Sequence, residues 1–316
     1  MSKSVSLSYF YFKAKIGKLF ANIISGFVRN KEKRHRLREK LDPLNPQRCV
    51  NYLAQHYTAV SPIAESLLAS DGTYVWVCWL QGEEQAPQMI RNCLQSVRYY
   101  KPEGSEVILI TAENYRHYAD LPEHIVSKWK AGIITNTHFS DLIRIFLLAR
   151  HGGYWVDATC LLTSPFPPYF TDSPLFLFRS HGEFAYTLIQ SCLIHCEKNH
   201  YVMRMWCAAM AAYWEREDRL INYFTLHLMF KALLQKDKHF ADEYAKIPAI
   251  SDEPMHVLLK PMVQGTAYSE ELMQRAKESS FMQKLSYKFP AEILNDQSSL
   301  AYVLSQPLVV SACENK

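Results

Sequence analysis

Asp157 and Thr159 follow a short apolar run at 154–156, which comes directly after Gly152 and Gly153. The two glycines allow a sharp backbone turn, and the run Tyr-Trp-Val predicts a short strand that presents Asp157 at its end. Side chains two residues apart point the same way in an extended chain. Mn²⁺ and Mg²⁺ take oxygen ligands and retain waters and substrate phosphate oxygens, so one carboxylate at a strand end can suffice. We therefore expect Asp157 and Thr159 to be metal ligands.

Asp141 and Arg144 are the only interior charges of the apolar segment that precedes this turn. The apolar residues around them predict a buried helix that Ser140 caps and that ends near His151. Residues three apart share one helix face, where burial of charge is costly unless the charges pair or meet a polar ligand. Two interpretations stay open for this pair, a structural ion pair and a contact with substrate.

Two predicted strands lie upstream, with a helix between them. The run 73–80 is rich in β-branched and aromatic residues, a helix follows from Pro87, and 106–111 is a continuous apolar run. This β-α-β order predicts a parallel sheet, whose ligand sites lie beyond the carboxyl ends of its strands. We accordingly assign substrate-binding roles to three residues at the end of the first strand, namely Trp79, Gln81 and Gly82.

A second group of polar residues lies around position 190. We include Gln190 and Ser191 among the candidate substrate-binding residues. The neighbouring residues Cys192, His195 and Cys196 fall within one helical turn, but no fourth ligand stands at a recognisable spacing. We interpret these three as core residues of a helix that continues past Ile194, and not as a zinc site.

The chain from Tyr201 onward is predicted to be mainly helical, and no linker rich in Gly, Ser or Pro marks a second domain. Tyr223 and His227 lie one turn apart in the predicted helix 221–234, and we expect them to pack instead of serving acceptor chemistry. We divide the chain into an arm, residues 1–48, and one enlarged domain, residues 49–316.

The composition is that of an ordinary globular protein. Hydrophobic residues make up 48% of the 316 residues and charged residues 21%, which excludes disordered and collagen-like chains. Eight scattered cysteines without a C-x-x-C pair are typical of reduced thiols in the cytoplasm. The chain also lacks G-x-S-x-G, P-loop and G-x-G-x-x-G patterns, which argues against hydrolases, P-loop kinases and dinucleotide-binding enzymes.

The positive charge belongs to the arm. Residues 1–40 contain eleven basic and two acidic residues, although the whole chain is only +4. Apolar residues from 12 to 28 recur at three-and-four spacing and predict an amphipathic helix, which a basic run at 29–40 follows. We expect a cytoplasmic protein whose arm, through Lys13–Lys40, binds the anionic surface at the inner face of the cell membrane. The alternative is packing on the domain. Nucleic-acid binding would depend on the arm alone and is not expected.

Two sequence motifs resemble a known family. S-D-L-I-R at 140–144 and G-G-Y-W-V-D-A-T at 152–159 resemble the capsular polysaccharide synthesis protein family, which is related to DXD-motif sugar transferases of GT-A type. W-x-x-G at 79–82 stands in the expected order, and a weaker echo follows at 284–288, so the likeness covers about 73–288. Threonine takes the place of the second acid of D-x-D, as in the closest branch of the family.

The resemblance implies an α/β, GT-A-like (Rossmann-like) fold with a mostly parallel sheet flanked by helices, a helical C-terminal half and a separate amphipathic arm. It also implies a metal-dependent, retaining glycosyltransferase of hexosyltransferase type. Its donor would be a nucleotide-sugar, with a UDP-sugar expected first, and its cofactor Mn²⁺ or Mg²⁺. Its acceptor would be a polysaccharide or lipid-linked glycan of a bacterial capsule or lipopolysaccharide. The alternative function is a catalytically silent nucleotide-sugar-binding or scaffold protein of polysaccharide assembly at the membrane.

Site residues follow from the same resemblance. Asp157 would meet the metal and the ribose, while Asp141 and Arg144 would hold the hydroxyls of the donor sugar. Trp79 would stack on the nucleotide base. Two further residues complete the predicted substrate-binding set, Tyr154 at the start of the short strand and Lys284, which we expect beside the diphosphate.

Overall fold

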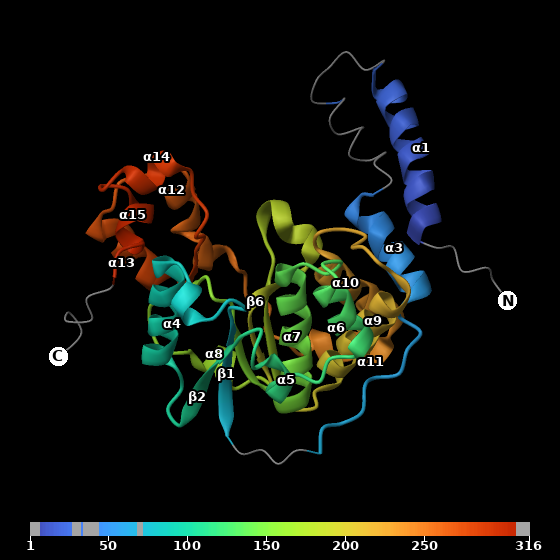
Figure 1. Ribbon diagram of the computed structural model, residues 1–316, viewed down its shortest axis with the longest axis horizontal. Coiled ribbons are helices and arrows are strands. Elements are labelled where there is room, and N and C mark those ends of the chain that lie inside the picture. The colour runs from blue at the N-terminus through green and yellow to red at the C-terminus, as the bar shows by residue number, and fades with distance from the viewer. Residues whose placement is uncertain (1–6, 27–32, 34–43, 68–71, 308–316) are drawn as a thin grey trace.

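The computed structural model describes residues 7–26, 33, 44–67 and 72–307. A five-stranded sheet lies at the centre of this part of the chain (Figure 1), in the order β2-β1-β3-β6-β5. The strands are β1 (Thr73–Cys78), β2 (Ser105–Ile110), β3 (Gly153–Val156), β5 (Leu175–Arg179) and β6 (Ile189–Cys196). A two-stranded ribbon joins β4 (Cys160–Leu162) to β7 (Met282–Lys284).

Most strands of the central sheet run in one direction. β1 is parallel to β2 and to β3, whereas β6 is antiparallel to both β3 and β5. Only β6 is therefore reversed. This arrangement, with helices on both faces of the sheet, confirms the predicted α/β fold with a mostly parallel sheet.

One face of the sheet supports the larger core. Trp76 and Trp155 point to this face, where they pack with Leu53, Phe146 and Met210 in a single apolar cluster. The helices that build this layer are α3 (Pro46–His56), α5 (Tyr115–Tyr118), α6 (Glu123–Lys130), α7 (Asn136–His151), α9 (Tyr201–Arg216), α10 (Thr225–Lys236) and α11 (Lys238–Ala245).

The opposite face of the sheet is covered by α4 (Gln88–Tyr100) and α8 (Pro168–Thr171). Since side chains alternate along a strand, Val75 and Tyr154 point to this side, away from their neighbours Trp76 and Trp155. The outer side of α4 packs against the C-terminal helices, seen beside it in Figure 1. These are α12 (Leu259–Val263), α13 (Glu270–Ser279), α14 (Ala291–Asn295) and α15 (Leu300–Leu304). Short 3-10 turns span Glu83–Gln85, Gly182–Thr187 and Glu253–His256.

Two predicted elements are wrong in type or extent. The segment that contains Cys192, His195 and Cys196 is the strand β6 and not a helix. A short apolar run buried on both faces has no periodicity that separates a strand from a helix. The helix α7 begins at Asn136, and its cap is Thr135, whose hydroxyl accepts from the amide of His138 at 3.3 Å, instead of Ser140. Threonine is also a good capping residue, and the earlier start adds one turn that carries His138.

The double glycine before β3 is required by close packing. Gly152 and Gly153 have φ values of +70° and +91°. A Cβ on Gly152 would lie 2.5 Å from the backbone nitrogen of Lys198, and one on Gly153 would lie 2.4 Å from the carbonyl oxygen of Tyr74. The turn predicted from sequence is confirmed, and it lets β3 approach β1 closely.

The amphipathic helix of the arm, α1 (Leu7–Gly26), has two different sides. Leu7 is fully buried, and the hydroxyl of Tyr11 donates to the carbonyl oxygen of Leu220 at 2.7 Å, so the start of α1 packs on the domain. The other side is apolar and exposed, with exposed fractions of 43–59% at Tyr9, Phe12, Ile16 and Phe20. Most of the basic run at 29–40 lies outside the described residues. No helix in the described part of the chain is long and apolar enough to cross a bilayer.

Candidate active site

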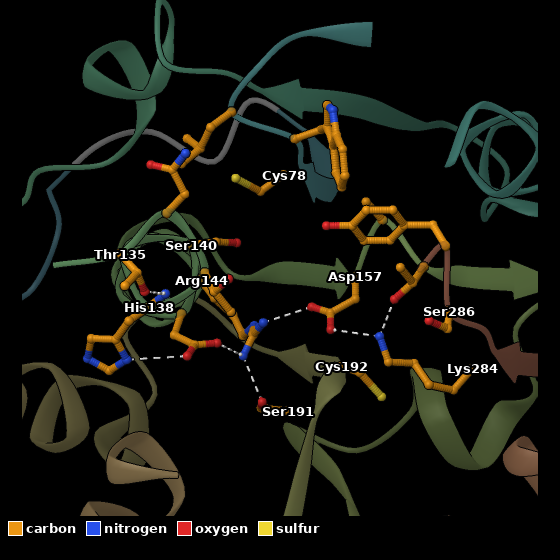
Figure 2. Close-up of a pocket in the computed structure, with 18 of the residues that line it drawn as sticks. Cys78, Thr135, His138, Ser140, Arg144, Asp157, Ser191, Cys192, Lys284 and Ser286 are labelled. Carbon is orange, nitrogen blue, oxygen red and sulfur yellow. Dashed lines mark hydrogen bonds and ion pairs between the residues drawn. The ribbon is translucent and has the colours of Figure 1, made fainter. Parts of the chain in front are cut away.

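A cavity of about 700 Å³ lies where the carboxyl ends of β1 and β3 meet the first half of α7. Its remaining walls come from the first residues of β6, the segment 220–227 before and within α10, and the segment 284–288 at the end of β7. Figure 2 shows side chains from these separate segments facing one another across the cavity. The site therefore lies at the sheet edge that the β-α-β pattern predicts.

Arg144 is the centre of the charged network. Its side chain is only 4% exposed, and its Nη1 donates to Asp141 Oδ1 at 2.9 Å and to Ser191 Oγ at 2.7 Å. Its Nη2 donates to Asp157 Oδ1 at 2.7 Å, and the guanidinium lies over the ring of Trp155. Burial disfavours the charged arginine, but Asp157 and Asp141 outweigh it and hold its pKa above the ordinary value. Arg144 thus joins the two predicted aspartates in one cluster.

Asp157 lies one residue beyond β3 and is held from both sides. Its Oδ1 also accepts from the indole nitrogen of Trp155 at 2.8 Å, and its Oδ2 lies 3.3 Å from the Nζ of Lys284. The backbone amide of Asp157 donates to the carbonyl oxygen of Cys192 at 2.8 Å, which ties this turn to β6. The carboxylate is about a quarter exposed and faces the cavity.

Lys284 approaches Asp157 from a distant part of the sequence. Its Nζ also hydrogen-bonds to Thr159 Oγ1, so the ammonium lies between the two side chains of the D-x-T motif. Burial disfavours the charged lysine, but the charge of Asp157 outweighs it and holds the pKa of Lys284 above its ordinary value. The side chain is therefore a cation at neutral pH. Figure 2 shows this contact on the opposite side of Asp157 from Arg144.

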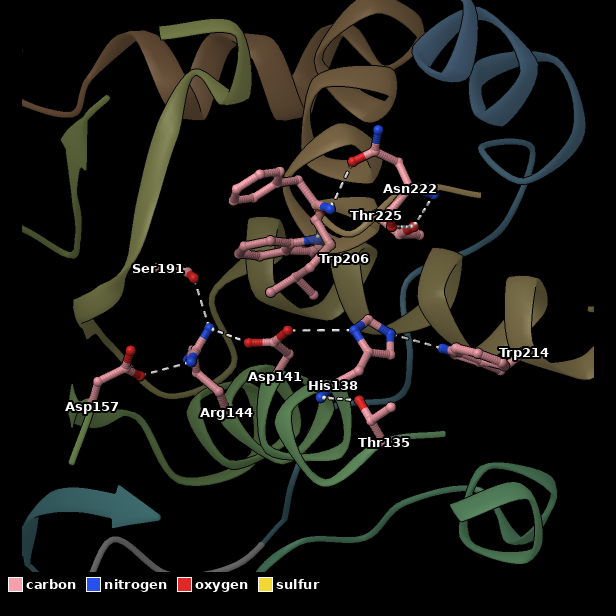
Figure 3. Close-up of polar contacts among 12 residues, drawn as sticks. Thr135, His138, Asp141, Arg144, Asp157, Ser191, Trp206, Trp214, Asn222 and Thr225 are labelled. Atoms are coloured by element: carbon pink, nitrogen blue, oxygen red, sulfur yellow. Dashed lines mark hydrogen bonds and ion pairs between the residues drawn. The ribbon is translucent and has the colours of Figure 1, made fainter. Parts of the chain in front are cut away.

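A second network fixes Asp141 (Figure 3). The indole nitrogen of Trp214 donates to His138 Nε2 at 3.0 Å, so the proton of a neutral His138 is on Nδ1. This atom faces Asp141 Oδ2 at 3.4 Å. Burial raises the pKa of Asp141, but Arg144 and His138 outweigh it and hold the pKa below its usual range. Asp141 is thus an ionised acceptor at the cavity wall.

His227 and Tyr223 form the wall beyond Asp141. Burial lowers the pKa of His227 to about 4, against the attraction of Asp141, so the imidazole is neutral at physiological pH. Its Nδ1 is buried and has no hydrogen-bond partner among the described residues. Tyr223 is 72% exposed at the mouth of the cavity. Tyr223 precedes α10 and is largely exposed, so the expectation that it packs on a helix is wrong. His227 packs against Phe224, as expected, and also lines the cavity.

The opposite wall is aromatic and basic. The rings of Trp79 and Tyr287 meet edge to face with centroids 5.3 Å apart. The indole nitrogen of Trp79 is buried without a hydrogen-bond partner in the described part of the chain. Lys288 lines the same wall. A flat aromatic group with a hydrogen-bond acceptor would fit against Trp79.

Most predicted site residues meet in this one cavity. The residues that line it are Trp79, Gln81, Asp141, Arg144, Asp157, Thr159, Gln190, Ser191 and Lys284. Two predicted substrate-binding residues do not. Tyr154 is 6% exposed and stacks on His195 on the opposite face of the sheet, because strand alternation sends Trp155 and Asp157 to the cavity side. Gly82 lies beyond the cavity, at the start of a short 3-10 turn.

Sequence reasoning gave no site role to several residues that line the cavity and that the site uses, namely His138, Tyr223, His227, Tyr287 and Lys288. A signal existed for His138, because Thr135 is as good a helix cap as Ser140 and an earlier start places His138 one turn before Asp141. For Tyr287, the family resemblance at 284–288 was a weak signal. No local pattern separates His227 from a core histidine.

The oxygen ligands around Asp157 do not fit the expected divalent cation. Asp157 Oδ1 already accepts from Arg144 and Trp155, and both Asp157 Oδ2 and Thr159 Oγ1 contact the ammonium of Lys284. Among the described residues, no group of three or more His, Cys, Asp or Glu side chains is placed to hold a metal ion. Mg²⁺ and Mn²⁺ can fill much of their octahedral shell with waters and phosphate oxygens, but they still need a free protein oxygen, and here a fixed positive charge occupies the approach.

Three comparisons relate the chain to known proteins. The family model described as capsular polysaccharide synthesis protein matches residues 25–303. An O-glycosyltransferase, braB of Annulohypoxylon truncatum, is 32% identical over 96 residues, which are 28% of this chain and 23% of that protein. The match therefore spans less than a quarter of that relative. Among solved structures, the PaToxG glycosyltransferase matches 73% of this chain and 84% of its own, with a TM-score of 0.36 and 12% identity.

Proposed function

Because the chain belongs to the capsular polysaccharide synthesis protein family, we propose that it is a glycosyltransferase. The reaction would move a sugar from a nucleotide-sugar, a UDP-sugar first among them, to a polysaccharide or lipid-linked glycan of a bacterial surface. The observation that carries the proposal is the convergence of Asp141, Arg144, Asp157 and Lys284 in one cavity of about 700 Å³. That volume is within the range of small-molecule sites.

The walls of the cavity suit the parts of such a donor. Ionised Asp141 would accept hydrogen bonds from sugar hydroxyls, and Arg144 fixes its position. Trp79 would stack on the base. Lys284 and Lys288 line the cavity, and they would bind the diphosphate, whose negative charge grows as the anomeric bond breaks. Tyr223 and His227 would form the acceptor side.

The transfer would retain the anomeric configuration, as the resemblance to retaining transferases suggests. The acceptor hydroxyl would then attack on the face from which the diphosphate leaves, and its proton would pass to a leaving phosphate oxygen. The anomeric signal of the product in an NMR spectrum tests this, and an inverted product would contradict it.

A screen of nucleotide-sugars tests the proposed activity. We expect one donor to release its nucleoside diphosphate. Asp157→Asn should slow this release by about 100-fold, because Asp157 holds the ammonium of Lys284, whose charge would stabilise the departing diphosphate. The control is Asp242→Asn, a carboxylate that is 56% exposed on α11. Thermal melting of each variant separates loss of activity from loss of folding. A folded Asp157→Asn variant as active as the parent would contradict the role of Asp157.

A parent that binds nucleotide-sugars without turnover would support the catalytically silent alternative.

We also propose that the exposed side of α1 binds an anionic lipid surface. Its apolar residues include Phe12 and Phe20, with exposed fractions of 59% and 58%, and Lys13 and Lys15 lie exposed beside them. The sequence continues with the basic run at 29–40, and each basic residue near an anionic leaflet adds about 1 kcal/mol of attraction. The protein would then work peripherally, at the cytoplasmic face of the membrane.

Vesicle flotation tests this membrane contact. The double substitution Phe12→Ser and Phe20→Ser should weaken binding to phosphatidylglycerol vesicles at least about tenfold. Burial of each phenylalanine side chain in the membrane would contribute about 1.5–3 kcal/mol to the binding free energy. Tyr99→Ser, at a tyrosine 56% exposed on α4, is the control. Equal flotation of the parent and the double variant, or equal binding to neutral vesicles, would contradict the proposal.

A further inference from the structure

The position of Lys284 is fixed by backbone pairing. β7 pairs antiparallel with β4 so that Lys284 lies opposite Cys160, and the amide of Leu285 donates to the carbonyl oxygen of Thr159 at 2.8 Å. The lysine therefore projects from the strand next to the D-x-T turn. Its Nζ lies 3.3 Å from Asp157 Oδ2 and also contacts Thr159 Oγ1. These are the two side-chain oxygens that the sequence assigned to a divalent cation.

The charges of the site balance without a metal ion. In a D-x-D site, two carboxylates offset a cation of charge +2. Here the neutral hydroxyl of Thr159 stands in place of the second carboxylate. The two carboxylates of the network, Asp141 and Asp157, then balance its two cations, Arg144 and Lys284. The other oxygen of Asp157 is paired with Arg144. Thr159 and Lys284 are thus complementary in charge, because a neutral hydroxyl stands in place of the second carboxylate and an ammonium of charge +1 in place of a divalent cation.

From this complementarity we propose that the ammonium of Lys284 takes the place of the divalent cation, so that the diphosphate of the donor is bound without a metal ion. The inference rests on the proposed nucleotide-sugar activity and names the group that serves its leaving phosphate. An ammonium has three N–H donors, and Asp157 and Thr159 engage two of them. The third is left for a phosphate oxygen.

In the transfer step, the bond between the anomeric carbon and the phosphate oxygen breaks, and its electron pair stays on that oxygen. The bond between the acceptor oxygen and the anomeric carbon forms, and the acceptor proton passes to the diphosphate. Lys284 keeps its own proton throughout and donates a hydrogen bond to the departing oxygen. It acts as a fixed positive charge, as a divalent metal ion would.

The first experiment uses the intact protein after removal of metals by chelation. Release of nucleoside diphosphate and calorimetric binding of UDP are measured with EDTA and with Mn²⁺. We expect both to agree within about twofold between the two conditions. Activity or UDP binding that EDTA abolishes and Mn²⁺ restores would overturn the inference, while leaving the proposed glycosyltransferase function intact. Absence of turnover with every donor, under both conditions, would count against the proposed function instead.

Variants of Lys284 give the second test. Lys284→Met should lower nucleotide release by about 100-fold with Mn²⁺ present or absent, and Lys284→Arg should retain part of the activity because it keeps the charge. Lys260→Met, at an exposed lysine on α12 outside the cavity, should change neither activity nor UDP binding. A folded Lys284→Met variant that keeps parental activity in EDTA would overturn the inference.

Direct measurement of Mn²⁺ binding tests the inference without any activity. Electron paramagnetic resonance of titrated Mn²⁺ should show no stoichiometric site in the parent, with or without UDP. The double variant Thr159→Asp with Lys284→Gln restores the second carboxylate and removes the ammonium, so it should bind one equivalent. A parent that binds one equivalent of Mn²⁺, lost in Asp157→Asn, would overturn the inference.

Discussion

At the scale of single residues, the site depends on one buried cation that serves two carboxylates. Arg144 is 4% exposed and bonds to Asp141, Asp157 and Ser191 at once. Removal of one partner from such a group leaves an unpaired buried charge, which typically costs about 3–5 kcal/mol. The two interpretations of the Asp141–Arg144 pair left open by the sequence are therefore compatible, because the ion pair is structural and also lines the cavity.

The neutral His227 makes stability depend on pH. Burial lowers its pKa in the folded protein to about 4, whereas an unfolded histidine titrates near 6.5. Between these values the unfolded chain binds the proton and the folded chain does not. Stability is thus fully present above pH 6.5 and falls as the pH drops toward 4, by up to about 3 kcal/mol from this residue.

Denaturant unfolding at pH 7.5 and pH 4.5 measures this effect. We expect His227→Gln, which has no titrating group, to lose less stability than the parent over this range. The difference between the two proteins isolates His227 from other histidines whose pKa burial lowers, such as His195 and His200. Equal losses in parent and variant would show that His227 does not carry the effect.

At the scale of elements, the close approach of β3 to β1 fixes the position of Asp157. Val75 pairs with Tyr154 and Trp76 with Trp155, and Asp157 follows one residue after β3 ends. This spacing is allowed only because Gly153 has no side chain to meet the carbonyl oxygen of Tyr74. A local sequence feature thereby sets the geometry of the site.

Gly153→Ala should destabilise the fold by more than about 2 kcal/mol. The added Cβ would lie 2.4 Å from a backbone oxygen, and alanine is strained at φ +91°. Gly72→Ala is the matched control, since a Cβ there meets nothing within 4 Å. The free energy of unfolding of each variant in urea is the measurement. A change at Gly153 no larger than the one at Gly72 would contradict the steric argument.

At the scale of the whole molecule, the segment before the sheet is part of the core. Tyr52 and Tyr57, on and just after α3, both donate to Glu217 Oε1 at the end of α9. Burial raises the pKa of Tyr52 to about 12, so its hydroxyl stays a donor at neutral pH. This buried cluster joins regions about 160 residues apart in sequence.

Glu217→Ala should cost about 1–3 kcal/mol, because it leaves two buried tyrosine hydroxyls without their acceptor. Glu217→Gln keeps an acceptor oxygen and should cost less. The control is Glu215→Ala, an exposed position on the same helix. Thermal and denaturant unfolding would report the differences, and similar losses at positions 215 and 217 would contradict the role of the cluster.

The sequence by itself determined the features that arise from near neighbours in the chain. The alternation of strands and helices gave the α/β fold, helix periodicity placed Asp141 and Arg144 on one face, and the double glycine placed Asp157 at a strand end. Periodicity failed at β6, where burial on both faces removes the pattern that separates strand from helix.

Tertiary structure decided the contacts of Asp157 with distant residues, since Lys284 was expected beside the diphosphate and not against Asp157 and Thr159. Lys284 reaches Asp157 from 127 residues away, and His227 joins the same cavity from another helix. Local propensities carry no information on such pairs, because they depend on how β4 pairs with β7 and how α10 packs beside the sheet. The expectation of a metal ligand pair came from local spacing, whereas the ammonium between those side chains is a product of the fold.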